Sequence, residues 1–249
     1  MNDRLVIIPT YNEKENIDDL FNRLTSLPVA FDILFVDDNS PDGTAELIRF
    51  YQKQNPDIYL IERESKMGLG TAYIKGFKWA LEKDYEYIFE MDADLSHNPE
   101  DLIRLYNAVK EKKADLAIGS RYISGVNVVN WPLGRVVMSY MASIYVRIIT
   151  GLKVKDTTAG FKCYRRAILE TINLDKVNSK GYVFQIEMKF LSWKYGYKIL
   201  EVPIVFTNRE KGFSKMSGGI FNEAIWGVFK LKWKSLFQSL DVDSSQHTK

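Results

Sequence analysis

Cysteine and histidine are scarce in this sequence. Its 249 residues include one cysteine, Cys163, and two histidines, His97 and His247. A single cysteine excludes an internal disulfide framework and a metal cluster held by several thiolates. It also agrees with residence in a reducing compartment.

Long apolar runs and a charge excess are missing as well. The 34 basic and 32 acidic residues leave a net charge of +2, which does not favour nucleic acid as a partner. The longest apolar stretch, 136–146, contains serines and is followed by Arg147, well short of the roughly 18 residues of a spanning helix. We therefore expect any membrane contact to be peripheral. The opening MNDRLVIIPT leads directly into a predicted strand, so no signal peptide is expected.

What the first half does contain is a regular alternation of short apolar runs with helical patterns. The runs at 5–9, 32–38, 58–62, 86–92 and 115–121 are predicted strands. The segments at 17–24, 45–51, 71–83 and 99–112 have helical spacing, and Asn98 before Pro99 is a typical helix start. This alternation predicts an α/β fold with a mostly parallel sheet covered on both faces.

The second half is less regular. It predicts helices at 133–150 and 182–195, strands at 159–163 and 198–206, and a polar loop at 207–218. We interpret residues 1–218 as one catalytic domain, 219–240 as an amphipathic helix, and 241–249 as a disordered tail.

Four polar or glycine-rich stretches follow predicted strands: PTYNE at 9–13, VDDNSPDGT at 36–44, MGLGT at 67–71 and DADLS at 92–96. Each has a local explanation, because such residues also form turns. The third stretch does not continue as a dinucleotide fingerprint, since Tyr73 occupies the third glycine position. Together they lie at the carboxyl edge of the predicted sheet, where open α/β proteins bind ligands.

Two carboxylates, Asp92 and Asp94, directly follow the strand at 86–92. Like charges this close do not neutralise each other, so the pair is either a solvated strand end or a site for a cation. If the strand continues through Asp94, both side chains point to one face. Carboxylates suit Mg²⁺ or Mn²⁺ bound together with substrate phosphates.

Basic residues that suit phosphate recognition lie elsewhere in the chain. Arg121 ends the fifth strand, Arg135 begins a helix with Ser139 four residues later, and Arg209 and Lys215 flank a glycine. Taken singly, each arginine could equally form a surface ion pair.

The motifs resemble the polyprenol-phosphate (dolichol-phosphate) mannosyltransferases, which are inverting glycosyltransferases of family 2. The resemblance runs in order over residues 5–218 and rests on PTYNE, VDDNSPDGT, MDADLSHNPE, GSRY, DTTAGFKCY, GYVFQIE, EVPIVF and the R-x-x-G-x-SK pattern at 209–215. It implies a Rossmann-like GT-A fold. It also implies transfer of mannose from GDP-mannose to a polyprenyl phosphate, with Mg²⁺ or Mn²⁺ as cofactor.

The resemblance also implies roles for particular residues. Donor binding is expected from Pro9, Tyr11, Glu13, Val36, Asp38, Asp92, Ala93, Asp94, Arg121, Arg209 and Lys215. The metal ligands would be Asp92 and Asp94, with Ser96 reaching the metal through water because some relatives have glutamine there. The acceptor phosphate would bind Arg135 and Ser139, and the catalytic residues would be Asp94, Arg121, Arg209 and Lys215.

No general base is evident. His247 lies in the tail, and His97 is expected to cap or solvate the turn before a helix. A phosphate acceptor needs none, because its second pKa near ~6 leaves it mostly dianionic at neutral pH. Such a nucleophile requires positioning and charge shielding, and its in-line attack would expel GDP and invert the anomeric carbon.

The helix at 219–240 carries an aromatic stripe with helical spacing: Trp226, Phe229, Trp233, Leu236, Phe237 and Leu240. The stripe either packs as core or enters a lipid interface. With a lipid acceptor, we expect the protein to be cytoplasmic and peripheral on the inner face of the membrane. A membrane-anchoring partner protein is compatible with this, because many relatives carry spanning helices.

Two alternatives remain at the level of sequence. One is the same fold with a UDP-sugar donor, transferring glucose or an aminosugar to undecaprenyl phosphate. The other is a non-catalytic nucleotide-sugar-binding protein, against which the retained Asp92, Asp94 and basic residues argue.

Overall fold

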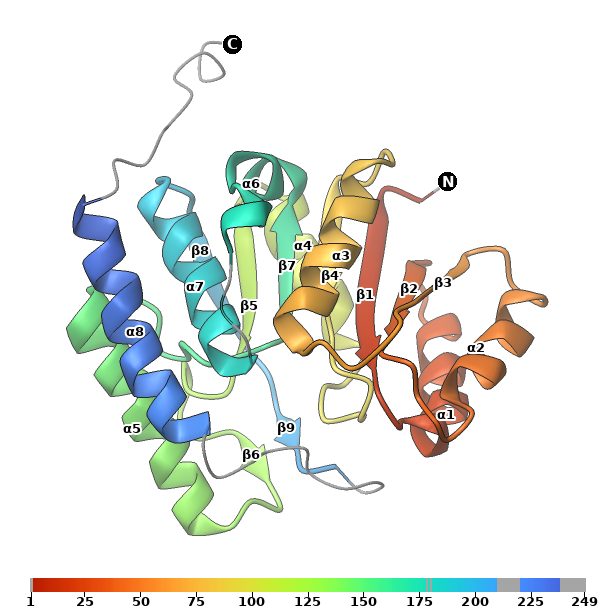
Figure 1. The fold of residues 1–249 in the computed structure, drawn as a ribbon, viewed down its shortest axis with the longest axis horizontal. Helices are drawn as coiled ribbons and strands as arrows, with labels where there is room; N and C mark the ends of the chain where they lie inside the picture. The colour runs from red at the N-terminus through yellow and green to blue at the C-terminus, as the bar shows by residue number, and fades with distance from the viewer. Residues whose placement is uncertain (1, 178, 180, 210–219, 238–249) are drawn as a thin grey trace.

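A seven-stranded sheet forms the centre of the molecule in the computed structural model (Figure 1). The structure describes residues 2–177, 179, 181–209 and 220–237. The strands lie in the order β3-β2-β1-β4-β7-β5-β8. Their bounds are β1 Arg4–Thr10, β2 Asp32–Asp37, β3 Ile58–Glu62, β4 Tyr87–Glu90, β5 Leu116–Ser120, β7 Lys162–Arg165 and β8 Ile199–Pro203. All neighbouring pairs are parallel except those made by β7, which confirms the predicted α/β fold with a mostly parallel sheet.

The strand β7 departs from the prediction in position and partners. It occupies residues 162–165, not 159–163, and runs antiparallel between β4 and β5. Its Cys163 is opposite Phe89 of β4 and Ala117 of β5. The apolar pattern predicted a strand here, but only these long-range pairings fix its register and direction.

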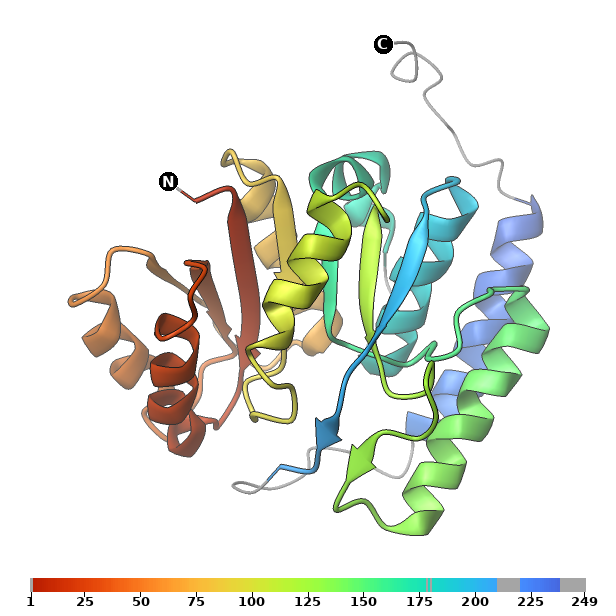
Figure 2. The same ribbon diagram turned by 180° about the vertical axis from the view of Figure 1, so that it is seen from behind.

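Helices cover both faces of the sheet (Figures 1 and 2). One face packs against α1 (Lys14–Thr25), α2 (Thr44–Gln52) and α4 (Asp101–Lys110). The other packs against α3 (Leu69–Leu81), α6 (Arg166–Thr171) and α7 (Gly181–Lys194). A short 3₁₀ helix, η1 (Leu174–Lys176), follows α6.

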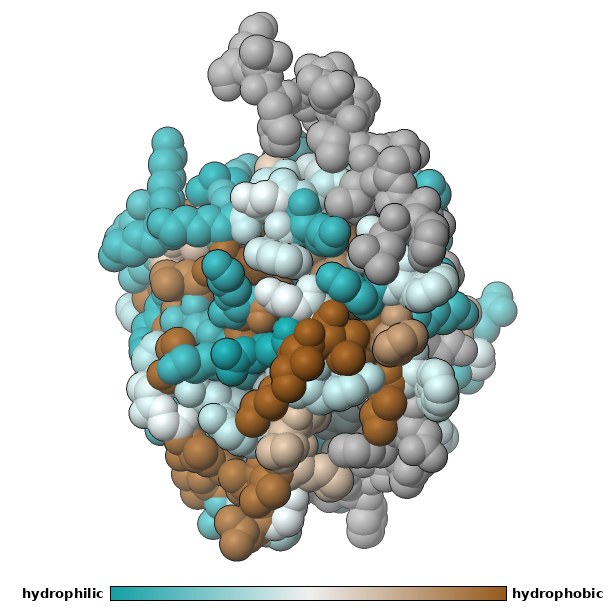
Figure 3. Space-filling model, turned by 90° about the vertical axis from the view of Figure 1, so that its left-hand side faces the viewer, coloured by the Kyte–Doolittle hydropathy of each residue, from teal (hydrophilic) through white to brown (hydrophobic). Residues whose placement is uncertain are grey.

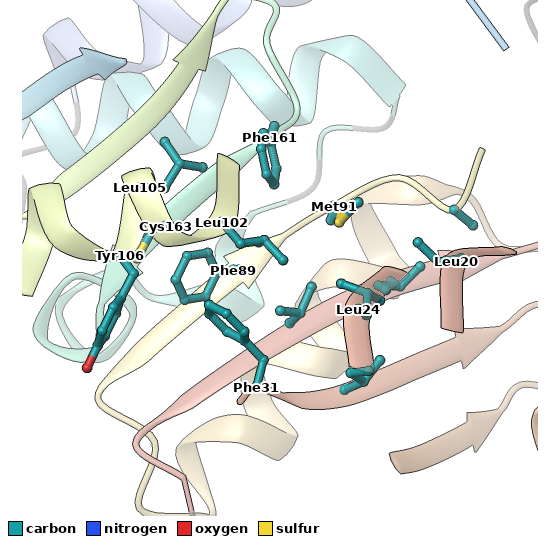
Figure 4. Close-up of a cluster of buried hydrophobic side chains, with 14 of the residues drawn as sticks. Leu20, Leu24, Phe31, Phe89, Met91, Leu102, Leu105, Tyr106, Phe161 and Cys163 are labelled. Carbon is teal, nitrogen blue, oxygen red and sulfur yellow. The ribbon is translucent and has the colours of Figure 1, made fainter. Parts of the chain in front are cut away.

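The core on the α1 and α4 face is built from large interlocking side chains (Figure 4). Phe89 of β4 contacts Phe31 edge-to-face, with ring centroids 5.4 Å apart. Leu102 and Leu105 of α4 are fully buried in the same cluster. Burial of both sheet faces explains why the strands are almost continuously apolar.

Two element boundaries differ from the predictions beside Asp92 and Asp94. Strand β4 ends at Glu90, so neither carboxylate belongs to a strand and the alternation argument for their facing does not apply. Helix α4 begins at Asp101, two residues after the predicted start at Pro99. The oxygen of the Asn98 side chain accepts the backbone N–H of Glu100 at 3.2 Å, so it stabilises the turn before the helix.

Beyond the carboxyl edge of the sheet lie β6 (Val128–Val129) and β9 (Phe206–Thr207), which pair with each other (Figure 2). The predicted strand at 198–206 is thus divided into β8 and β9. The backbone N–H of Thr207 donates to the carbonyl of Ser96 at 3.1 Å, which joins β9 to the DADLS turn.

Two further helices, α5 (Leu133–Thr150) and α8 (Ile220–Phe237), pack beside α7 (Figure 1). Val228 and Leu231 of α8 are buried against Val146 of α5 and Phe190 of α7. The described part of the chain contains no helix with the length and apolar character needed to cross a membrane. The predicted tail at 241–249 lies outside the described residues.

Candidate active site

A cavity of about 430 Å³ opens at the carboxyl edge of the sheet, within the size range of ligand pockets. Its walls come from the segments that follow β1 and β4, and from α3, α5, α7 and β9. The chain leaves β1 toward β2 on one side and returns to β4 on the other, so the cavity lies at a topological switch point.

The cavity brings together most of the site residues that the sequence predicted. Its lining includes Pro9, Tyr11, Glu13, Asp38, Asp92, Ala93, Asp94, Arg121, Arg135 and Arg209. Val36 is buried in the sheet core, and Val36, Ser96 and Ser139 are not among the lining residues. Lys215 lies outside the described residues.

The turn after β4 presents the two predicted carboxylates. Leu95 adopts φ 59°, in the left-handed region, and the chain reverses there toward α4. The side chain of Asp94 accepts the backbone N–H of Ser96 at 3.1 Å and forms an ion pair with Arg209 at 2.8 Å. Asp94 is 8% exposed, so the interpretation as a solvated strand end is wrong.

Negative charge accumulates around Asp92. Burial, followed by the charges of Asp94 and Glu90, raises the pKa of Asp92 to about 7. Glu90 is fully buried beneath it and accepts hydrogen bonds from Lys162 at 3.0 Å and from Tyr164 at 2.7 Å. A cation bound between Asp92 and Asp94 would relieve the remaining repulsion.

The two carboxylates fit a divalent metal whose remaining coordination positions are filled by the substrate. No group of three or more His, Cys, Asp or Glu side chains that could hold a metal occurs among the described residues. Two carboxylates with the remaining positions left to phosphate and water is the usual arrangement for Mg²⁺. Asp92 and Asp94 are the residues that would hold it.

On the β1 and β2 side, the wall of the cavity is stabilised by partners that the sequence did not reveal. Asp38 forms a buried ion pair with Arg63, whose Nη1 also donates to Thr71 at 2.7 Å. The amine of Lys66 lies over the ring of Tyr11, 4.3 Å from its centroid. Gly68, at φ 100°, starts α3 in a conformation that favours glycine.

Two other carboxylates of the VDDNSPDGT stretch, Asp37 and Asp42, have structural roles. Asp37 accepts hydrogen bonds from Thr10 at 2.7 Å and from the Ser40 hydroxyl at 2.6 Å. Asp42 accepts the backbone N–H of Thr44 at 3.0 Å, at the start of α2.

Three of the predicted basic residues, Arg121, Arg135 and Arg209, line the cavity and have protein partners of their own. Arg121 binds Asp156 through Nε at 2.7 Å and Nη2 at 2.6 Å. Arg135 donates to the side-chain oxygen of Asn208 at 3.0 Å, and its guanidinium lies 4.1 Å from the ring centroid of Trp131. Ser139 lies one helical turn beyond Arg135 on α5.

A buried lysine on α7 anchors the loop that carries Thr157 and Ala159. The amine of Lys189, on α7, is fully buried and donates to the carbonyls of Thr157 at 2.8 Å and of Ala159 at 2.6 Å. Lys162 and Lys189 were missed by the sequence reasoning. The available signal was a lysine inside an otherwise apolar strand or helix pattern, which is rare without a specific partner.

The expectation for His97 is wrong. Its ring is 3% exposed and stacks on Phe161, with centroids 4.8 Å apart, and does not solvate or cap the turn. Within the described chain, its Nδ1 has no hydrogen-bond partner. Burial lowers the pKa of His97 to about 4, so this histidine is neutral at pH 7.

This buried histidine predicts a pH-dependent stability. The unfolded chain protonates His97 near its ordinary pKa of 6.5 and the folded protein near 4, so the unfolded state binds more protons between these values. Lowering the pH from 7 to 5 should therefore cost about 2 kcal/mol through this group. Urea unfolding of the wild type and of His97→Gln at both pH values measures it, and equal pH dependence in the two proteins would contradict the assignment.

A mostly parallel α/β sheet with an acidic pair and arginines at its switch point is the arrangement of a GT-A glycosyltransferase. The family model described as Glycosyl transferase family 2 matches residues 5–172, and the chain belongs to this family. The predicted family and glycosyltransferase activity are thereby confirmed.

Named relatives cover most of the chain. An undecaprenyl-phosphate mannosyltransferase of Micrococcus luteus is 47% identical over 237 residues, covering 93% of this chain and 96% of its own. A polyprenol monophosphomannose synthase of Mycolicibacterium smegmatis is 48% identical over 230 residues, covering 90% and 86%.

Solved structures confirm the GT-A fold. A Mycobacterium tuberculosis glucosyl-3-phosphoglycerate synthase, in complex with Mn²⁺, UDP and glucosyl-3-phosphoglycerate, matches with a TM-score of 0.66 at 15% identity, over 92% of this chain and 78% of that one. A mannosyltransferase of Pyrobaculum calidifontis, in complex with GDP-Man and Mn²⁺, matches with a TM-score of 0.58 at 15% identity, over 92% and 69%.

Proposed function

We propose that this protein transfers mannose from GDP-mannose to a polyprenyl monophosphate, with inversion, giving polyprenyl-phosphate mannose and GDP. The observation that carries the proposal is the Asp92–Asp94 pair at the β1/β4 switch point, with Asp92 half-buried and Asp94 buried in an ion pair with Arg209. The names of the two relatives, at 47% and 48% identity, support mannose as the sugar and a polyprenyl phosphate as the acceptor.

The donor would occupy the cavity from β1 and β2 toward the carboxylates. Pro9, Tyr11, Glu13 and Asp38 would contact the nucleoside, with Val36 supporting them from the core. Arg121 and Arg209 would lie beside the diphosphate, and we propose that Lys215 joins them. Positive charge there stabilises the departing GDP.

A divalent cation, Mg²⁺ or Mn²⁺, is the proposed cofactor. Bound to the diphosphate, such an ion neutralises charge that develops on the leaving group. Asp92 and Asp94 would hold it, and the Ser96 backbone N–H fixes the orientation of Asp94. Two structural neighbours that are complexes with Mn²⁺ agree with a divalent metal.

The acceptor phosphate would enter from the α5 side. Arg135, stacked on Trp131, and Ser139 one turn later are the proposed ligands of that phosphate. A dianionic phosphate oxygen needs no general base, so the protein has to hold it in line with the anomeric carbon and shield its charge.

We also propose that α5 and α8 contact the inner face of the membrane. Figure 3 views the side of the molecule that carries these helices, and apolar side chains gather on it. Trp226, Phe229 and Trp233 of α8 are 73%, 50% and 58% exposed, and Leu133 and Met141 of α5 are 78% and 55% exposed. Lys230 and Lys234 are exposed beside the aromatic residues, where lipid phosphates would bind them. A membrane-anchoring partner protein stays a prediction.

This membrane contact predicts a defect in vesicle binding. Trp226→Glu combined with Trp233→Glu should weaken co-sedimentation with anionic phospholipid vesicles at least about 10-fold, because two exposed apolar anchors are lost. The matched control is Phe50→Glu, a change of a 56% exposed aromatic residue on α2. Equal loss of binding in the control and the double variant would refute a specific interface on α8.

Transfer of labelled sugar into the organic phase tests the function directly. We expect labelled product from GDP-mannose and a short polyprenyl phosphate with Mg²⁺, and none with EDTA. If only UDP-glucose or UDP-N-acetylglucosamine gave product, the donor proposal would be wrong and the transferase class would stand. Absence of product with every donor, in lipid and in detergent, would refute the proposal and favour a binding protein.

A further inference from the structure

One buried amide in the cavity has no hydrogen-bond partner. Gln185, on α7, is 3% exposed and lines the cavity. Neither its Nε2 nor its Oε1 is hydrogen-bonded within the described part of the chain. Burying an amide without partners is unfavourable, and native proteins rarely leave both of its atoms unsatisfied. A bound ligand would remove this cost.

The neighbour of this amide is Gly160, which keeps space open in front of it. A Cβ atom at position 160 would lie 3.4 Å from Nε2 of Gln185 and 3.8 Å from Oδ2 of Asp92. The backbone of Gly160 does not adopt a positive φ, so its conformation does not require glycine. The missing side chain therefore leaves room between the amide and the carboxylate.

The chemistry of the amide limits what can bind there. A phosphate group only accepts hydrogen bonds, so it would satisfy Nε2 and be repelled by Oε1. A metal ion would satisfy Oε1 and leave Nε2 unpaired. A hydroxyl group both donates and accepts, and adjacent hydroxyls of a sugar can engage both atoms of one amide.

We propose that Gln185 hydrogen-bonds hydroxyl groups of the transferred sugar, and so selects and orients that sugar beside Asp92. This inference rests on the proposed function. It assigns the sugar subsite to the space bounded by Gln185, Gly160 and Asp92.

Gln185→Met tests the assignment because it keeps the length of the side chain and removes both polar atoms. With GDP-mannose, kcat/KM should fall about 10- to 100-fold, the loss expected when a site built for a hydroxyl loses its partner. Inhibition by GDP, which has no sugar, should not change. The melting temperature should stay equal or rise, because an unsatisfied buried amide is removed.

Deoxy donors identify the interaction itself. In the wild type, removing the contacted hydroxyl from GDP-mannose should lower kcat/KM by a similar factor, and in Gln185→Met the same removal should cost nothing further. Equal losses for every deoxy donor in both proteins would overturn the proposal. A fall in melting temperature together with weakened GDP inhibition would also overturn it, since that pattern means a structural role.

Two further variants complete the test. Gly160→Ala fills the space beside Gln185 at ordinary contact distance and should lower kcat/KM without changing GDP inhibition. Gln52→Met, on the exposed end of α2, is the matched control and should change nothing.

If the wild type used a different nucleotide sugar, GDP-mannose would be refuted as donor, and deoxy forms of the actual donor would test Gln185 separately. If the wild type were inactive with every donor, both the proposed function and the proposed role of Gln185 would be overturned.

Discussion

Asp94→Asn is expected to lower mannose transfer at least about 100-fold, because it weakens the proposed site for the cation that would offset the negative charge developing on the leaving group. It removes one of the two proposed metal ligands and the ion pair of Asp94 with Arg209 at 2.8 Å. The loss should appear in kcat at saturating GDP-mannose, and higher Mg²⁺ should restore only part of it.

Folding should survive this substitution. The variant keeps an oxygen that can accept the backbone N–H of Ser96, and it relieves the repulsion that contributes to the raised pKa of Asp92. We therefore expect a melting temperature within a few degrees of the wild type. Asp84→Asn, at an exposed residue on the opposite edge of the sheet, is the matched control. Full transfer by Asp94→Asn at ordinary Mg²⁺ would remove the basis for the metal proposal.

Asp156→Ala is expected to destabilise the fold by about 3–5 kcal/mol, because it leaves a buried guanidinium without its counter-charge. Asp156 is fully buried and Arg121 is 6% exposed. The carboxylate accepts the backbone N–H of Arg121 at 2.9 Å in addition to both side-chain hydrogen bonds. Burial raises the pKa of Asp156, but the charge and hydrogen bonds of Arg121 outweigh it and hold this pKa below its ordinary value.

Urea unfolding at pH 7 measures this effect. Glu170→Ala, which breaks the partly exposed pair of Glu170 with Arg166, should cost less than about 1 kcal/mol. Replacing both Arg121 and Asp156 by leucine should cost less than Asp156→Ala alone, because no unpaired charge remains. A loss below about 1 kcal/mol for Asp156→Ala would show that water or another group compensates Arg121.

Much of the fold follows from local pattern. Strands and helices alternate where periodicity places them, and parallel pairing follows from the helical crossovers between strands. β7 shows the limit of this reasoning. Its apolar residues predicted a strand, but pairing of Cys163 with Phe89, 74 positions earlier in the chain, is a long-range packing outcome. Short β6 and β9 have too few residues to carry a period.

The residues of the candidate site also fall into two groups, those that local sequence predicts and those that it does not. Asp92, Asp94 and Arg209 could be predicted because they stand in recognisable motifs at the end of a strand or in a polar loop. His97 was misjudged because its local sequence, beside a helix start, says nothing about Phe161 and Phe206, which enclose it. Gln185 lies in a motif, but only the fold shows that its amide faces the cavity unpaired.

The class of fold, the edge of the sheet where the cavity lies and the family could all be read from residue order and local spacing. The pairing of charges, their burial, and the absence of hydrogen-bond partners for certain buried polar groups of the described residues became visible only in the folded structure. Arg121 is hydrogen-bonded to Asp156, 35 residues away in the sequence, and Lys162 to Glu90, 72 residues away. Such contacts set pKa and stability through burial and distance, two quantities that exist only once distant parts of the chain pack together.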